Sequence, residues 1–315
     1  MKKVQIILSS DERILLEALV RNSRFTPGFI AQMMGKSRNW VSRTVRGLAT
    51  SGVIRAYTTI VNPNLVQGAR GTILFMKSNP REQDVSAKLL AMEELESLDG
   101  ISGYHSLLGF FRFDSQGDFE KLLDKVDHVV ASSGAGKFDL VQILTAFKKN
   151  FFRIIQPTTP RSPLTAKELA LLDIMYRYEP TSEHPFPLTQ ARIGELMNPK
   201  MSQSAVSKAI DKLTLKRAIA GYSIDIDFGL INVPLKFFVR IKVLPGSASE
   251  LVQKLVEDEH IWDLYRTSEE YSLFATIRTR NISSYNQFLR DLYEIECVLD
   301  THSYLSLEEW FVPFR

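Results

Sequence analysis

The chain contains an internal repeat, and this feature limits its fold more than any other. Residues 34–58 (MGKSRNWVSRTVRGLATSGVIRAYT) align at a constant offset with residues 199–223 (PKMSQSAVSKAIDKLTLKRAIAGYS). The identical positions include serines, a valine, a leucine and a tyrosine: Ser37 with Ser202, Val41 with Val206, Ser42 with Ser207, Leu48 with Leu213 and Tyr57 with Tyr222. Because self-similar segments fold alike, the chain is expected to hold two copies of one unit.

The repeat extends in both directions from this stretch. Upstream, LSSDERILLEAL (8–19) resembles LTAKELALLDIM (164–175) at a smaller offset, so the second copy has extra residues, which we place in a loop at RYEPTSEHPF (177–186). Downstream, TILFMKSNP resembles FFVRIKVLP, and DFEKLLDKV resembles SYNQFLRDL. The chain is therefore predicted to be a tandem duplication, joined near residues 148–163, where prolines interrupt any periodic pattern.

The first part of each copy has the pattern of three helices and a strand. In the first copy Ser9 or Ser10 can cap a helix, and a second helix follows Thr26. Gly35 then provides a turn before a third helix, which has an apolar face and a polar face. Residues 53–61 (VIRAYTTIV) have the β-branched and aromatic content of a strand that would form a wing. Three helices and a wing predict a winged helix-turn-helix.

The rest of each copy alternates strands and helices. In the first copy the order is strand GTILFMK, helix SAKLLAMEEL, strand HSLLGFFRF, helix DFEKLLDKV and strand FDLVQILTAF, with ISGY as part of a further strand. This is the β-α-β-β-α-β order of a ferredoxin-like module, whose helices cover only one face of the sheet. The other face must also be covered, so we expect the modules to pair with each other or with a second chain.

The predicted fold class is α+β, with each winged helix-turn-helix followed by a ferredoxin-like module. The expected order along the chain is the first winged helix-turn-helix at 1–65, its ferredoxin-like module at 66–150, a linker at 151–163, the second winged helix-turn-helix at 164–231 and its module at 232–315.

Composition excludes some classes of protein. The 315 residues include 39 basic and 36 acidic ones, and the net charge of +3 is too small to indicate a polyanionic partner by itself. Cys297 is the single cysteine, so an internal disulfide is excluded, and no Cys/His cluster has zinc spacing. We therefore expect a cytoplasmic protein without a metal or cofactor. No signal sequence or membrane span is recognisable, so no membrane partner is expected.

A family resemblance rests on residues 41–63. The string VSRTVRGLATSGVIRAYTTIVNP resembles the third helix and wing of the Lrp/AsnC (feast/famine) transcriptional regulators, whose typical run is V-S-R-x-V-x-x-L followed by G-V-I-x-x-Y. The second copy, VSKAIDKLTLKRAIAGYS, matches this pattern at fewer positions. The resemblance implies a ferredoxin-like module at 66–147 and at 232–315 that dimerises and often binds an amino acid. A chain that carries both copies would mimic a dimer of the usual single-unit regulators.

One loop departs from the family pattern. Family members usually carry a T-G-x-Y-D stretch where ligand and subunit contacts gather. The second copy reads RTSEEYS, without the glycine and the aspartate, and the first reads YHSLLGF, which indicates a shortened loop. These departures argue against an amino-acid effector.

Basic charge is concentrated around the predicted third helix of the first copy. Residues 36–55 contain a lysine and several arginines but no acidic residue. A helix in the major groove can present arginine to guanine and asparagine to adenine, so base contacts are expected from Arg43, Arg46 and Asn39. The remaining residues predicted to contact double-stranded DNA are Ser37, Arg38 and Ser42 in the first copy and Ser204, Ser207, Lys208 and Lys212 in the second.

The two predicted recognition helices differ at one informative position. Asp211 stands where the first copy has Arg46. A carboxylate repels phosphate but can accept a hydrogen bond from cytosine, so the two helices are expected to prefer different bases. The sequence thus predicts a transcriptional regulator with an asymmetric DNA site.

Two other functions are consistent with the same architecture. Siroheme decarboxylases also combine a winged helix with a ferredoxin-like module, some as fused chains, and would need histidines that converge on a carboxylated tetrapyrrole. The five histidines here share no motif, so no catalytic residue is predicted: His105, His128, His184, His260 and His302. An architectural chromatin protein would bind DNA with strong salt dependence and little sequence preference.

Overall fold

The computed structural model describes residues 6–65, 70–79, 84–131, 137–155, 164–228, 230–231, 235–310 and 312. The chain forms two compact units, each built from both halves of the sequence. Met1–Leu65 and Pro157–Val233 make the first unit, and Val66–Gln156 and Pro234–Arg315 make the second. Corresponding segments of the two halves therefore lie together in one unit.

Three helices and a strand occur twice in the first unit. The first half supplies α1 (Ser10–Arg21), α2 (Pro27–Met34), α3 (Arg38–Thr50) and β1 (Ile54–Val61). The second half supplies α6 (Ala166–Tyr176), β7 (Arg177–Tyr178), α7 (Gln190–Leu196), α8 (Gln203–Leu215) and β8 (Ile219–Ile226).

Side-chain caps set where these helices begin. Ser9 and Thr165 each form a capping box with a glutamate three positions further on, which satisfies backbone donors at the starts of α1 and α6. Ser37 and Ser202 accept hydrogen bonds from the backbone in the first turns of α3 and α8. Gly35 follows α2 at a φ of 64°, a conformation that glycine adopts without steric cost, as the sequence predicted.

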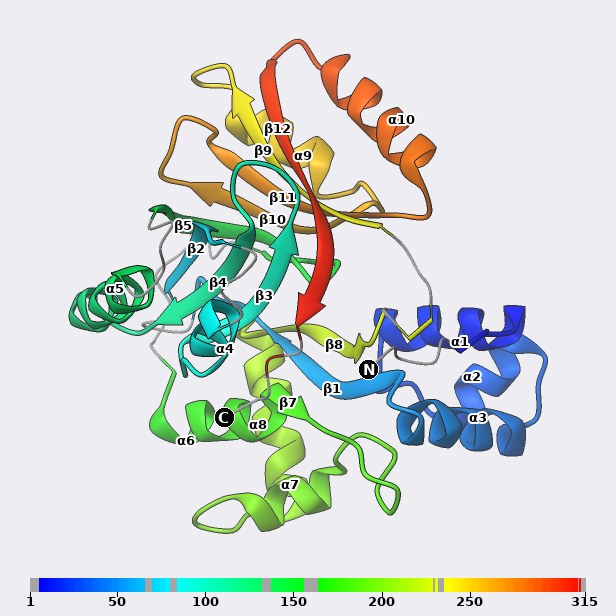
Figure 1. Ribbon diagram of the computed structural model, residues 1–315. Coiled ribbons are helices and arrows are strands. Elements are labelled where there is room, and N and C mark those ends of the chain that lie inside the picture. The colour runs from blue at the N-terminus through cyan, green and yellow to red at the C-terminus, as the bar shows by residue number, and fades with distance from the viewer. Residues whose placement is uncertain are drawn as a thin grey trace. The chain divides into compact units, whose positions relative to one another are not determined.

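The strand that was predicted to be a wing joins the two halves instead. β1 pairs antiparallel with both β8 and β7, in the sheet order β7-β1-β8 (Figure 1). Ile224 and Ile226 of β8 are buried in the core formed by α1, α2 and α3, and β1 packs against α6. The wing prediction is thus corrected, because β1 satisfies its backbone hydrogen bonds with strands of the second half.

The extra residues of the second half also contact the first half. We predicted a loop at 177–186, but Arg177 and Tyr178 form β7 against β1. The Tyr57 hydroxyl donates a hydrogen bond of 2.8 Å to the Pro185 carbonyl oxygen. The inserted segment therefore covers one edge of β1.

The second unit contains the β-α-β-β-α-β order twice, as predicted. The first half supplies β2 (Arg70–Lys77), α4 (Asp84–Leu90), β3 (Leu95–Ile101), β4 (Leu107–Phe113), α5 (Gln116–Ala131) and β5 (Lys137–Lys149), followed by β6 (Phe152–Arg153). The second half supplies β9 (Leu235–Val243), α9 (Ala248–Leu255), β10 (Ile261–Thr267), β11 (Leu273–Thr279), α10 (Ile282–Tyr293) and β12 (Val298–Trp310).

Three local expectations are corrected in this unit. The helix expected to continue through SAKLLAMEEL ends at Leu90, and Leu95 begins β3. Phe152 and Arg153 were expected in the linker but pair with β5, since the chain reverses at Asn150 and Phe151, both with positive φ. The loop after β3 is not shorter than its counterpart in the second copy, because residues 102–106 between β3 and β4 match 268–272 between β10 and β11 in length.

The two ferredoxin-like sheets join each other at both edges. The strand order is β10-β11-β9-β12-β3-β4-β2-β5-β6, and β10 also pairs with β5, so the strands close into a ring. Phe75, Phe238, Phe274 and Tyr304 are buried where the two sheets face each other. The two modules of one chain thus cover each other's bare faces, which is the first of the two predicted arrangements.

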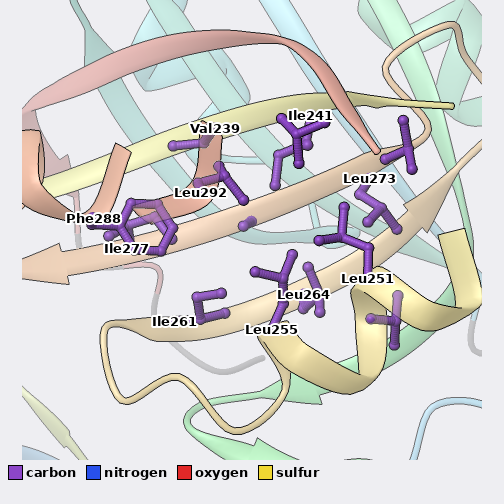
Figure 2. Close-up of a cluster of buried hydrophobic side chains, with 14 of the residues drawn as sticks. Val239, Ile241, Leu251, Leu255, Ile261, Leu264, Leu273, Ile277, Phe288 and Leu292 are labelled. Carbon is purple, nitrogen blue, oxygen red and sulfur yellow. The ribbon is translucent and has the colours of Figure 1, made fainter. Parts of the chain in front are cut away.

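Helices cover the opposite face of each sheet. In the second module, Leu251 and Leu255 of α9 pack on the strands together with Phe288 and Leu292 of α10 (Figure 2). In the first module, a separate cluster of buried apolar side chains joins α4 and α5 to the sheet.

Candidate nucleic-acid interface

The polar face of α3 is presented to solvent. Val41, Val45 and Leu48 are buried at helical spacing, which turns the residues between them outward. Outward residues with exposed side chains are Arg38, Asn39, Arg43 and Arg46, and Ser42 is half-buried. The hydroxyl oxygen of Ser37 accepts the hydrogen bond from Trp40 N that caps the helix.

No carboxylate of the described residues pairs with the arginines on this face. Within the described ranges, Arg38, Arg43 and Arg46 form no ion pair. Two other basic residues of the 36–55 segment do: Lys36 pairs with Asp11, and Arg55 with Asp225. The basic surface is therefore narrower than the sequence suggested, and it is centred on α3.

The corresponding face of α8 is less basic. Ser204 and Lys208 are exposed and Ser207 is half-buried, at positions that match those of α3. Lys212 Nζ, however, lies 3.1 Å from Glu168 Oε1. One of the two lysines predicted to contact DNA from this helix is thus paired within the protein.

Glu168 is a residue whose role at this surface the sequence did not reveal. Its side chain is 6% exposed, and Lys216 Nζ donates to both carboxylate oxygens at 2.8 Å. Burial alone would raise the pKa of Glu168, but hydrogen bonds from Lys216, the Thr165 backbone and Lys212 lower it to about 2. Glu168 also completes the capping box of α6, and no local signal in the sequence linked it to α8.

Asp225 of β8 was also missed. Its two carboxylate oxygens accept hydrogen bonds of 2.7 Å from Arg55 of β1 and Arg177 of β7. The three strands of the small sheet are therefore joined by one carboxylate. Because the partners lie far apart in the sequence, no spacing pattern could have indicated this contact.

Two of the five histidines come together around one tyrosine in the second unit. The Tyr304 ring centroid lies 4.6 Å from that of His302 and 6.4 Å from that of His105. Burial lowers the pKa of His105, although Asp139 Oδ2, at 3.1 Å from its Nε2, opposes this change. The described residues contain no group of His, Cys, Asp and Glu that could hold a metal ion.

Comparisons with known proteins match parts of the chain that correspond to the modules described above. A family model described as the Lrp/AsnC ligand binding domain matches residues 236–312. The HTH-type transcriptional regulator LrpA of Mycobacterium tuberculosis is 30% identical over 125 residues, which are 38% of this chain and 81% of that regulator. The chain belongs to the Lrp/AsnC family.

Other relatives of this Lrp/AsnC protein are also regulators. The HTH-type transcriptional regulator LysM of Sulfurisphaera tokodaii is 29% identical over 113 residues, which are 36% of this chain and 79% of LysM. Each of these relatives thus corresponds to about one half of the present chain.

A solved structure matches nearly the whole Lrp/AsnC chain. The crystal structure of the siroheme decarboxylase NirDL has a TM-score of 0.61, covers 95% of this chain and 92% of its own, and is 12% identical. At that identity the likeness concerns the fold alone. No helix among the described residues is long and apolar enough to cross a membrane.

Proposed function

We propose that this Lrp/AsnC protein is a sequence-specific transcriptional regulator that reads an asymmetric site on double-stranded DNA with α3 and α8. The observation that carries this proposal is the exposed polar face of α3, with Asn39, Arg43 and Arg46 on one side of the helix. Arginine offers two parallel donors to guanine, and asparagine pairs in the same way with adenine.

The proposed asymmetry rests on the differences between α3 and α8. Arg43 corresponds to Lys208, Asn39 to Ser204, and Arg46 to Asp211. An exposed carboxylate in place of an arginine changes which base can be contacted and weakens attraction to phosphate. Both helices belong to the same unit, so one chain would present two different reading faces.

Binding-site selection from random double-stranded DNA tests this proposal. We expect an enriched site whose two halves differ in sequence, as the different residues of α3 and α8 require. A perfect inverted repeat as the best site would contradict the asymmetry, and binding without sequence preference would favour an architectural chromatin protein.

Footprinting with single variants assigns each half-site to a helix. Arg43→Ala is expected to lose about 1–3 kcal/mol of binding free energy and to relax preference at one position. Lys208→Ala is expected to affect the other half-site. Arg290→Ala and Lys254→Ala, on exposed faces of α10 and α9, are matched controls and should leave the footprint unchanged.

A tetrapyrrole enzyme is the second candidate function. It is favoured by the whole-chain similarity to the fold of NirDL and by the grouping of His105 and His302 around Tyr304. A Soret absorption band in the purified protein, or a shift of the Soret band of an added iron tetrapyrrole when the protein is mixed with it, would support this function. Specific DNA binding by protein that shows no such band supports the regulator.

A further inference from the structure

A buried charge cluster lies at one of the two junctions between the ferredoxin-like modules. Asp99 of β3 is 1% exposed, and Lys236 Nζ of β9 lies 2.9 Å from each of its carboxylate oxygens. Ser306 of β12 donates a hydrogen bond of 2.7 Å to the same carboxylate. The first module thus supplies a buried anion, and the second module supplies the groups that neutralise it.

Two further charges of the second module complete the cluster. Lys236 Nζ also lies 3.4 Å from Glu309 Oε2, and both oxygens of Glu309 accept hydrogen bonds from Arg278, at 3.0 and 2.8 Å. Without Asp99, the second module would place two cations beside one carboxylate in a largely buried position. The positive and negative charges of the cluster are equal in number only when both modules are present.

The other junction has the same strand geometry but different residues. Asp99 pairs in register with Glu309, and the equivalent pair between β10 and β5 is Tyr265 with Ala146. In the strand register, Lys236 of β9 lies opposite Arg278 of β11. The equivalent positions in the first module, on β2 and β4, hold Gly71 and Arg112. A tyrosine, a glycine and an alanine therefore replace the aspartate, the lysine and the glutamate.

At the positions that match the charge cluster, this second junction is apolar and closely packed. Tyr265 and Ala146 are buried in the core between the sheets. A Cβ atom built at Gly71 would lie 3.0 Å from Ile143 Cδ1, which leaves little room for a side chain such as lysine. The large tyrosine of the second module meets small residues of the first.

We infer that the two modules are matched to each other and reject a second copy of themselves. In a pair of first modules, Asp99 would be buried against Gly71, Ala146 and Ile143, without the lysine that neutralises it. In a pair of second modules, Tyr265 would meet Lys236 and Glu309, and no Asp99 would balance the cations. A buried charge that loses its partner is strongly destabilising, so both self-pairs are disfavoured.

In a pair of first modules, Arg112 stands at the position that corresponds to Arg278. Arg112 is half-exposed, with its Nε 3.9 Å from Glu96 Oε1, and Arg278 itself bonds to Glu309 and not to Asp99. In such a pair Asp99 would compete with Glu96 for this one arginine, and no residue would stand at the position of Lys236.

Reassortment of a cleaved chain tests the inference independently of DNA binding. A protease site placed within residues 157–163 of the full chain allows the folded protein to be cut into a first-half and a second-half fragment. The cut protein is unfolded in urea and refolded by dilution, and native mass spectrometry counts the pairs. We expect pairs of unlike fragments to exceed pairs of like fragments by about a hundredfold or more.

Substitutions at Asp99 separate this cluster from the rest of the interface. Asp99→Tyr gives the first module the residue found at the matching position of the second, so pairs of first-half fragments are expected to become about tenfold more frequent. Asp99→Asn, which keeps the shape of the side chain, should raise the same pairs to a lesser extent and serves if tyrosine prevents refolding. Asp127→Tyr, on the exposed face of α5, is the matched control.

Two results would overturn the inference. One is a statistical mixture of like and unlike pairs in the unsubstituted protein. The other is a frequency of first-half pairs that remains at the unsubstituted level in both Asp99 variants.

Discussion

At the scale of single residues, carboxylates decide which basic side chains remain available to a partner. Asp225 holds Arg55, and Glu168 holds Lys216 and Lys212, whereas the described arginines of the α3 face have no such partner. Counting basic residues in the 36–55 segment therefore overstated its charge. The contrast between α3 and α8 is sharper in the structure than in the sequence.

The buried Glu168 should make stability depend on pH. Its pKa in the folded protein is about 2, below its ordinary value of 4.5, so its charged form contributes stability above about pH 5 that is lost as the pH falls toward 2. Between these limits the unfolding free energy should fall by roughly 1–3 kcal/mol more in the unsubstituted protein than in Glu168→Gln. Glutamine retains a capping-box side chain, so denaturant titrations at several pH values isolate the effect of the charge. Parallel curves for the two proteins would contradict this prediction.

At the scale of secondary-structure elements, the helices were predictable and the partners of the strands were not. Capping residues such as Ser9, Ser37 and Thr165 act within one turn of the chain, so their sequence signals are local. The pairing of β1 with β8 joins residues far apart in the sequence, and β-branched content indicates a strand without naming its neighbour. For this reason the polar face of α3 was recognised while the wing prediction was wrong.

The contact between α7 and α8 gives a test at this scale. A Cβ atom at Gly194 of α7 would lie 2.2 Å from the backbone oxygen of Met201, just before α8. Gly194→Ala should therefore lower the unfolding free energy by about 2 kcal/mol or more, since the backbone must shift to relieve the overlap.

Gly47 of α3 is the matched control for this substitution. A Cβ atom there would meet nothing within 4 Å, so Gly47→Ala should stabilise the helix by about 0.5–1 kcal/mol. Thermal unfolding of both variants measures the difference in sign. Equal effects would show that the close approach at Gly194 is relieved without cost.

At the scale of the whole molecule, the chain forms two units that each combine both of its halves. The sequence predicted two copies and their internal order, and it predicted that the ferredoxin-like sheets would need cover. Whether that cover would come from the same chain was left open, because the junction residues Asp99 and Lys236 lie in opposite halves and carry no shared motif. The match between an acidic residue of one module and a basic residue of the other can be recognised only when the pairing of the strands is known.

Separate units predict separate unfolding steps. Asp225→Ala removes the carboxylate between Arg55 and Arg177, whose side chains are only 18% and 15% exposed, so the first unit should lose about 1–3 kcal/mol. Scanning calorimetry should show two transitions, of which this variant lowers one. A single transition that shifts as a whole would indicate that the two units unfold cooperatively.

The ring of strands that closes within one chain has a consequence for how the protein responds to its own abundance. Regulators that assemble from separate subunits come apart on dilution, so their active fraction falls as expression falls. Here both modules are tethered covalently, and their association is independent of concentration. The two modules should therefore stay paired at any dilution of the protein, down to the lowest copy number.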